Sequence, residues 1–470
     1  MGPDMDRNIV RIAGILFSAF FTVMVYLTYI QVFQADDLLN HPRNKRLQFL
    51  EEAVIRGRII DSRGRVMAET VNTGNNSQRV YPYGEITGHI TGYVSKKYAR
   101  WGLESSYNRE MLGLAGGLAG DGGWAIERAI SSGQHGNDII LSLDAELQAK
   151  AYNLLGDRKG AVVAIEPSTG RVLAMASRPG FNPEDIEIKW DDLREDPDSP
   201  LLNRASQGLY PPGSAMKVVT AAGILQAEPE TINRIFDAPG YVIIEGRRIE
   251  DKQAVGRMGL REAFARSSNY VFSTLGLELG AQAFLKTARE FWMTKDFPFD
   301  IYSESGRIPK PEDMSRLELG ESAIGQGRVL VTPLNMAMVV GAIANGGELM
   351  APVLVDEVRK PDGSVIKTNR PQVLGTPVDR QLAGIIREMM VSVVKDGTGK
   401  AAAIKGVEVA GKTGSAENPH GQPHAWFIGF APADSPRVAV AVIIENGGAG
   451  GKQAAPVARE IMKSVIGQKR

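Results

Sequence analysis

Three short polar segments, far apart in the chain, combine the residue types needed for acyl transfer through a serine ester. They are Ser214-Ala215-Met216-Lys217, Ser267-Ser268-Asn269 and Lys412-Thr413-Gly414-Ser415. Each segment contains a hydroxyl group, and two of them contain a lysine. Each is common by itself, so the prediction depends on all three occurring in this order.

The first segment begins where the chain breaks before a helix. Tyr210-Pro211-Pro212-Gly213 ends one element, and the pattern from Ala215 to Gln226 predicts a helix. Ser214 then lies at the helix N-terminus, with Lys217 on the same face. A serine hydroxyl needs a neighbouring base, and a lysine serves only when burial, a second cation or the helix end lowers its pKa from about 10.4. The alternative is a solvated helix face, which is the commoner setting for this pattern alone.

The second segment follows Phe264-Ala265-Arg266, within or at the end of a helical pattern from Leu260 to Leu279. Its hydroxyl and amide groups could relay a proton and hold a substrate amide. The alternative is that serine and asparagine only cap a helix, which is common for both residue types.

The third segment continues a strand-like stretch from Val407 to Gly411, so we expect it at the end of a strand. Gly414 would let a ligand approach the backbone closely. Lys412, Thr413 and Ser415 would offer a cation and two hydroxyls to a carboxylate. The alternative is an ordinary polar strand end.

Residues Gly406 to Thr413 also match the phosphate-loop pattern of nucleotide-binding proteins. That loop needs a strand before its first glycine and a helix after its lysine. Here a strand-like stretch fills the gap, and prolines follow, so nucleotide binding is disfavoured. The five histidines are scattered, and His420 and His424 lie beside prolines. We therefore expect no metal site and no cofactor.

The composition narrows the class of protein. A chain of 470 residues predicts two or three domains. A formal net charge of zero gives no basic field for nucleic acid, so we expect no nucleic-acid partner. The absence of cysteine excludes disulfides, thiolate catalysis and cysteine-ligated zinc.

The N-terminus contains an uncharged, mostly apolar run of 19 residues from Ile12 to Ile30. As a helix it is roughly 28 Å long, about the hydrocarbon thickness of a bilayer. The alternatives are a cleaved signal peptide and a buried helix. The run leaves through Gln31-Val32-Phe33-Gln34 without a small-residue cleavage site, which favours an uncleaved anchor in the lipid bilayer. Basic residues lie on both sides of the run, so charge does not decide its orientation.

Four regions are predicted along the chain: a tail at 1–11, a transmembrane anchor at 12–33, a small β-rich membrane-proximal pedestal at 34–135, and a catalytic domain at 136–470. A β-hairpin at Arg56 to Ala68 belongs to the pedestal. The catalytic domain has strands at both ends and helices between them. This order predicts the α/β (α+β) class, with an antiparallel sheet that carries helices on its faces. The strands expected there are 139–143, 161–165, 172–176, 407–411, 426–430 and 438–445. The helices expected there are 146–155, 215–226, 260–279, 333–344, 379–394 and 455–466.

From the anchor to its end, the chain resembles the class B penicillin-binding proteins. Beyond the three segments that open this section, the resemblance rests on further stretches, which are Arg56 to Ala68, Gly102 to Asn108, Gly160 to Ser177, Asn203-Arg204-Ala205, Tyr210 to Ser214, Ala323 to Gly327, Thr332-Pro333, Ala344 to Gly347 and Ala425 to Phe430.

The resemblance implies an α/β transpeptidase domain, like that of serine β-lactamases, on a membrane-proximal pedestal. It implies that Ser214 is the nucleophile and Lys217 its base, and that Ser267 relays a proton and Asn269 orients the peptide. It further implies that Lys412 lowers the pKa of Lys217 and binds the substrate carboxylate together with Thr413 and Ser415, next to Gly414. The backbone N–H groups of Ser214 and Ser415 would form the oxyanion hole.

The same resemblance implies the substrates and the place of action. The donor would be a D-Ala-D-Ala stem peptide of peptidoglycan, the acceptor an amine of a neighbouring stem, and β-lactams would acylate the same serine. The chain would be a single-pass protein of the bacterial cell membrane, with a cytoplasmic N-terminus and an extracytoplasmic catalytic domain. A lipid-II glycan polymerase would be its membrane partner. The alternatives are a D,D-carboxypeptidase or β-lactamase, and a non-catalytic β-lactam-binding scaffold.

The sequence departs from the family pattern in two places. The fourth position of the third segment is Ser415 where threonine is frequent, which keeps the hydroxyl. The predicted pedestal of about 100 residues is short for the family and is similar to that of a compact subgroup.

Overall fold

The computed structural model describes residues 3–34, 54–73, 76–114, 135–251, 253–419 and 421–467. Its first element is helix α1 (Pro3–Phe33). Within it, Arg7–Phe33 is long and apolar enough to cross a membrane, by length and composition. The predicted anchor therefore lies in a single helix. The basic residues that follow the apolar run, Arg43, Lys45 and Arg46, fall outside the described residues.

A five-stranded antiparallel sheet forms the centre of the catalytic domain, as the sequence predicted. Its first two strands in the chain form a hairpin that pairs with strands from the end of the chain. In spatial order the strands are β17 (Ala410–Ala416), β18 (His424–Ala431), β19 (Val438–Ile444), β7 (Gly160–Ile165) and β8 (Val172–Arg178). The third polar segment thus lies on an edge strand, and one side of its backbone is free to meet a ligand.

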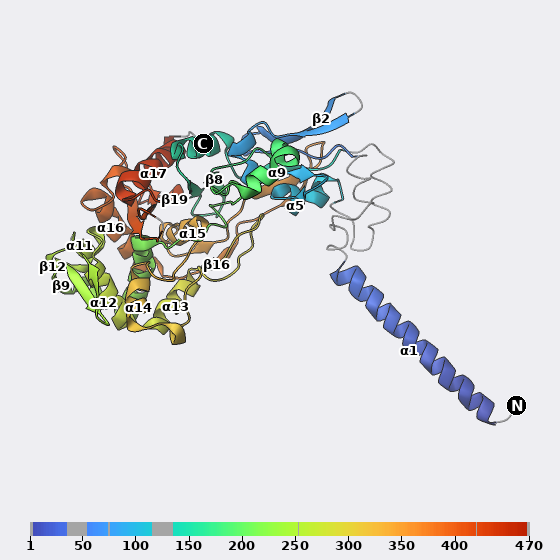
Figure 1. Ribbon diagram of the computed structural model, residues 1–470, viewed down its shortest axis with the longest axis horizontal. Helices are drawn as coiled ribbons and strands as arrows, with labels where there is room; N and C mark the ends of the chain where they lie inside the picture. The colour runs from blue at the N-terminus through green and yellow to red at the C-terminus, as the bar shows by residue number, and fades with distance from the viewer. Residues whose placement is uncertain are drawn as a thin grey trace.

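Both faces of the sheet are buried, because its strands carry apolar side chains at successive positions. On β7, Val162 packs with residues of α8 (Ala145–Leu155) and α17 (Gly450–Gly467). Val163 points to the opposite face, where α15 (Pro333–Ala344) lies. Figure 1 shows β19 running between α17 and α15. The alternation of side chains along a strand places helices on both faces.

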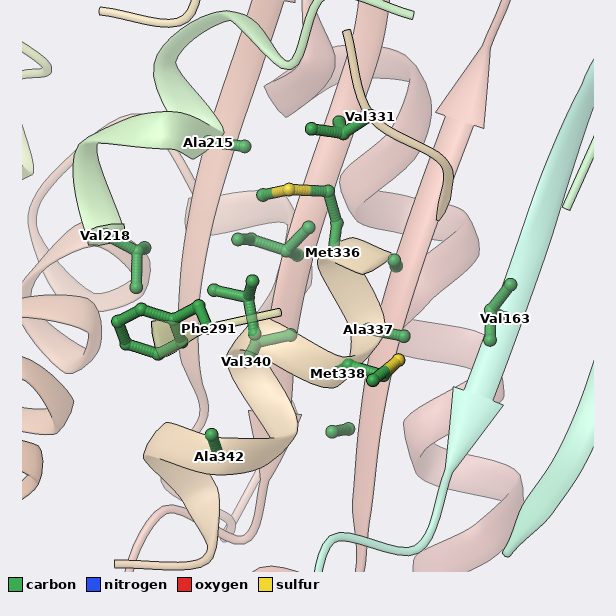
Figure 2. Close-up of a cluster of buried hydrophobic side chains, with 14 of the residues drawn as sticks. Val163, Ala215, Val218, Phe291, Val331, Met336, Ala337, Met338, Val340 and Ala342 are labelled. Carbon is green, nitrogen blue, oxygen red and sulfur yellow. The ribbon is translucent and has the colours of Figure 1, made fainter. Parts of the chain in front are cut away.

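Helix α15 lies between the sheet and the start of the first helix of the active site. It begins with a capping box in which Thr332 and Asn335 exchange hydrogen bonds, with proline at the first helical position. Nearly all of its residues are buried. Val163 lies on one side of α15, and Ala215 and Val218 lie on the other (Figure 2). The helix therefore joins strand β7 and the segment that contains Ser214 in one buried core.

A further group of elements gathers beyond α15, at the end of the molecule opposite β2 and α5 (Figure 1). They surround the first two polar segments. They are α10 (Lys217–Ala227), β9 (Ile235–Ala238), β10 (Tyr241–Ile244), β11 (Arg247–Glu250), β12 (Gly256–Gly259), α11 (Leu260–Ala265), α12 (Asn269–Leu279), α13 (Ala281–Glu290), α14 (Arg316–Ala323) and α16 (Arg380–Lys395).

A second sheet joins the N-terminal hairpin to the catalytic domain. The hairpin predicted at Arg56 to Ala68 is confirmed, because β1 pairs antiparallel with β2. Strand β1 also pairs in parallel with β6, which in turn pairs with β14. The order of this sheet is β15 (Val365–Thr368), β14 (Val355–Arg359), β6 (Asp138–Leu141), β1 (Ile59–Ile60), β2 (Val66–Thr73) and β3 (Asn76–Val80). Main-chain hydrogen bonds therefore cross the boundary predicted at residue 135.

A buried ion network holds the hairpin against α5 (Leu103–Ser106). Arg56 donates from Nε to Glu104 Oε2 at 2.5 Å, and Arg79 donates from Nε to Glu104 Oε1 at 2.8 Å. Burial alone would raise the pKa of Glu104, but Arg79 and Arg56 hold it below its usual value. A buried carboxylate with two guanidinium partners keeps its charge, and removal of one partner is strongly destabilising.

His89 provides a pH-dependent contact between the two parts of the chain. It is buried on α4 (Gly88–Thr91), and its Nε2–H donates to the carbonyl of Pro200 at 2.8 Å. Burial lowers its pKa from 6.5 to about 4. Below pH 6.5 the unfolded chain therefore binds more protons than the folded chain.

We expect the contribution of His89 to stability to be complete above about pH 6.5, to fall as the pH decreases towards 4, and to total about 3 kcal/mol. Chemical denaturation across this pH range measures the free energy of unfolding. His89→Gln keeps a donor for Pro200 but does not titrate, so its curve should lack this decline. Parallel curves for the two proteins would contradict the prediction.

Candidate active site

Ser214 lies in a turn that is held by hydrogen bonds to two other segments of the chain. A 3₁₀ turn, η3 (Gly213–Met216), leads directly into α10, so the predicted position of Ser214 at a helix start is confirmed. Gly213 has φ +53° and donates from its N–H to the carbonyl of Gly325 at 2.8 Å. Trp426 donates from Nε1 to the carbonyl of Pro211 at 3.0 Å. Ser214 itself is partly exposed.

Lys217 is completely buried, and its amine points to Ser214. Its Nζ lies 3.0 Å from Ser214 Oγ, 2.6 Å from the carbonyl oxygen of Ser267 and 2.8 Å from Asn269 Oδ1. The last two oxygens can only accept hydrogen bonds. A neutral amine has two hydrogens to donate to them, and its lone pair is then left for a hydroxyl hydrogen. This arrangement is the one that a general base needs.

Ser267 lies in a break between two helices, so the single helix expected from Leu260 to Leu279 is wrong. Helix α11 ends at Ala265, and α12 begins at Asn269. Ser267 has φ +64°, which a helix cannot contain. Ser268 caps α12 by accepting from the N–H of Val271 at 3.2 Å. The capping alternative therefore applies to Ser268, whereas Ser267 and Asn269 contact Lys217.

Lys412 meets the same site from the sheet. It is completely buried and donates from Nζ to Ser267 Oγ at 2.8 Å and to the carbonyl of Thr413 at 3.1 Å. The strand expected from Val407 to Gly411 is wrong, because β17 begins at Ala410 and continues to Ala416. The whole motif pairs with β18, with Lys412 opposite Ile428. The motif is thus inside a strand and not a phosphate loop.

Thr413, Gly414 and Ser415 continue along the edge strand beside Ser214. Thr413 is buried, and its Oγ1 lies 2.5 Å from Thr398 Oγ1, whereas Ser415 is exposed. A side chain at Gly414 would place its Cβ 2.8 Å from the carbonyl oxygen of Pro212. The strand therefore lies directly against the turn that contains the nucleophile. All eight residues singled out in the sequence are brought to this region.

Burial and like charge set the protonation of the two lysines. Burial lowers the pKa of Lys217 to about 7, against the raising effect of Asp251. Burial and the nearby Lys217 hold the pKa of Lys412 well below its usual value. Both amines lie over aromatic rings, Lys217 over Phe272 and Lys412 over Phe264. At neutral pH, part of the Lys217 population is therefore neutral.

Sequence reasoning missed two residues of this site, Thr398 and Asp251. Thr398 contacts Thr413 from the turn after α16. Asp251 follows β11 and accepts from Ser268 Oγ at 2.6 Å. Neither residue belongs to a recognisable motif, and both reach the site through tertiary packing, so no local signal in the sequence could have found them.

Gly414→Ala should reduce the rate of acylation of Ser214 by a β-lactam by at least about tenfold, since a displacement near 1 Å is enough for such losses. The new Cβ would lie 3.0 Å from Trp426 Cβ and 3.2 Å from the N–H of Ala215, so the nucleophile turn must move. Gly384→Ala on α16 is the control, because nothing lies within 4 Å of its Cβ. Its rate should stay unchanged, and equal rates in all three proteins would contradict the prediction.

The chain was compared with family models. The penicillin binding protein transpeptidase domain matches residues 160–463, and the penicillin binding protein A dimerisation domain matches residues 56–122. The first match covers the central sheet and all three polar segments.

Similar relatives and solved structures agree with these matches. The peptidoglycan D,D-transpeptidase PbpA of Mycolicibacterium smegmatis is 34% identical, over 98% of this chain and 99% of the relative. An imipenem acyl-enzyme complex of penicillin-binding protein A from M. tuberculosis has a TM-score of 0.82 at 34% identity, covering 89% of this chain and 100% of that one. The D,D-transpeptidase domain of a peptidoglycan glycosyltransferase from Eggerthella lenta has a TM-score of 0.80 at 35% identity, covering 88% and 98%. The chain belongs to the penicillin-binding protein transpeptidase family.

Proposed function

We propose that the protein is a membrane-anchored serine D,D-transpeptidase that cross-links peptidoglycan stem peptides through an acyl-enzyme on Ser214. The observation that carries this proposal is the buried amine of Lys217, 3.0 Å from Ser214 Oγ, with two acceptor-only oxygens on its other sides. It is supported by the relatives that are peptidoglycan D,D-transpeptidases and by the neighbours that are β-lactam acyl-enzymes.

In the first step, Ser214 Oγ attacks the carbonyl carbon of the peptide bond between the two terminal D-alanines. Its proton passes to neutral Lys217, and the backbone N–H groups of Ser214 and Ser415 stabilise the oxyanion. The C–N bond then breaks, and the leaving amine takes a proton. Ser267, which contacts both Lys217 Nζ and Lys412 Nζ, relays that proton. D-alanine leaves, and an ester to Ser214 remains.

In the second step, an amine of a neighbouring stem attacks this ester. Lys217 accepts a proton from the amine as the new amide bond forms, and Ser214 regains its proton as the ester bond breaks. Before the first step, Lys412, Thr413 and Ser415 bind the terminal carboxylate of the donor, which later leaves with D-alanine, and Gly414 lets it approach the strand. Asn269 orients the donor peptide through one hydrogen of its Nδ2, while the other is donated to the carbonyl of Glu250 at 3.0 Å.

We further propose the arrangement of the chain in the cell. Residues 1–11 lie in the cytoplasm, 12–33 cross the bilayer as a single span, 34–135 form a pedestal, and 136–470 act outside the membrane where peptidoglycan is built. The apolar helix Arg7–Phe33 supports a membrane span. A lipid-II glycan polymerase is a fitting partner, since cross-linking needs newly polymerised glycan strands close by.

Ser214→Ala should abolish covalent labelling by a fluorescent penicillin, because alanine has no side-chain oxygen with which to form the ester. The label is read on a denaturing gel and its position by mass spectrometry of the labelled peptide. Ser435→Ala, at an exposed turn, is the matched control and should label like the wild type. A covalent adduct on Ser214→Ala would show that the nucleophile has been misassigned.

The acylation rate should rise with pH and reach its midpoint near pH 7, since the pKa of Lys217 is about 7 and only its neutral form accepts a proton. The measurement is the second-order rate constant of penicillin acylation at a series of pH values. A rate that stays constant from about pH 5.5 to 8.5 would contradict the role of Lys217 as base.

A stem-peptide donor ending in D-Ala-D-Ala, incubated with an amine acceptor, separates the remaining functions. We expect release of D-alanine together with a new amide between donor and acceptor. Hydrolysis as the sole reaction would instead indicate a D,D-carboxypeptidase or β-lactamase. Penicillin binding without turnover of the donor would indicate a non-catalytic scaffold.

A further inference from the structure

Asp251 is a buried carboxylate directly behind the segment that contains Ser267 and Asn269. It follows β11, and its own backbone is anchored because its N–H donates to the carbonyl of Gly240 at 2.8 Å. Only 5% of its surface is exposed. A carboxylate buried to this degree needs partners, and those partners define what it does.

Both partners of Asp251 flank Asn269. Ser268 donates from Oγ to Asp251 Oδ2 at 2.6 Å, and Tyr270 donates from its backbone N–H to the same oxygen at 2.9 Å. The adjacent residue, Glu250, accepts from Asn269 Nδ2 through its carbonyl at 3.0 Å. Residues 250 and 251 thus bind three successive residues, which are the last two of the second polar segment and Tyr270.

These hydrogen bonds account for two unusual features of the segment. Ser267 keeps a left-handed backbone at φ +64°, which is unfavourable for serine unless the surroundings impose it. The Asn269 amide is turned so that its Nδ2 faces the carbonyl of Glu250 and its Oδ1 faces Lys217 Nζ at 2.8 Å. Both features place hydrogen-bond acceptors on the amine of Lys217.

Asp251 also brings a negative charge to a site with two amines. Among the described residues, Lys217 on α10 contacts Ser214 in η3, Ser267 in the break between α11 and α12, and Asn269 at the start of α12. Lys412 on β17 contacts Ser267 and the carbonyl of Thr413. The charge of Lys217 acts on Lys412, and the charge of Asp251 acts on Lys217. Asp251 is the carboxylate in this set. In a buried site its charge acts with little screening.

We infer that Asp251 is a positioning residue for the transpeptidase reaction, and that it is also the counter-charge of Lys217. This inference rests on the proposed function of the site. Through Ser268 and Tyr270 it holds Ser267 and Asn269 in contact with Lys217. Through its charge it keeps a proton available to Lys217 at neutral pH.

Asp251→Asn separates the two roles, because the amide oxygen can accept both hydrogen bonds of Oδ2 while the charge is lost. With the charge removed, Lys217 loses its proton more easily, so the acid limb of the acylation rate against pH should move to lower pH. We expect a shift of at least about half a pH unit. The probe is a fluorescent penicillin, with full-length protein in detergent.

Ser268→Ala is the control, since it removes one hydrogen bond to Asp251, together with the cap of α12, and keeps the charge. We expect this variant to be acylated more slowly, with its midpoint within about 0.2 pH units of the wild type. If Asp251→Asn does not fold, Asp251→Ser and Asp251→Glu replace it. Both disturb the hydrogen bonds, and the serine variant alone should shift the midpoint.

An unmoved midpoint in a folded, acylated Asp251→Asn would overturn the role of its charge. An equal shift in Ser268→Ala would overturn it as well, because the shift would then come from lost positioning. Unchanged rates in Ser268→Ala would overturn the positioning role. In these cases the wild type still forms its adduct on Ser214, whereas a wild type that forms none would reject the proposed function itself.

Discussion

Two buried amines that meet at one hydroxyl are the constraint on which the rest of this structure depends. Lys217 and Lys412 both contact Ser267 Oγ, one from a helix and one from a strand. Burial disfavours a charged amine, and two charged amines side by side are disfavoured further. The fold must therefore offset an unfavourable polar cluster with apolar packing around it. Phe264, Phe272 and the buried faces of α15 supply that packing.

The same packing makes the site rigid. The turn with Ser214 touches the strand through Gly414, the loop at Gly325 and the indole of Trp426. Helix α15 lies between Val163 of the sheet and Ala215 of this turn (Figure 2), and the edge strand β17 contacts the turn directly. The position of the turn with Ser214 depends on all of these contacts together. A nucleophile with its base already in place loses little entropy when the substrate arrives, which is how preorganised sites gain rate.

Local patterns predicted most of the elements of the catalytic domain and the residues of the site. The hairpin of β7 and β8 and helix α15 were visible because alternation, capping and proline placement are written in adjacent residues. The break at Ser267 was not, since no local pattern marks a left-handed backbone at a serine, and the contacts around it come from other segments. The extent of β17 also escaped, because polar residues suggest a strand end, and only pairing with β18 carries the strand through them.

The strand order has a consequence for the chain while it is being synthesised. Strand β7 pairs on one side with β8, which follows it closely, and on the other with β19, near the end of the chain. Until residues 438–444 have been synthesised, β7 has an open edge and two apolar faces. Such a hairpin is a site for aggregation. The nascent hairpin therefore stays open to aggregation until β19 can pair with β7.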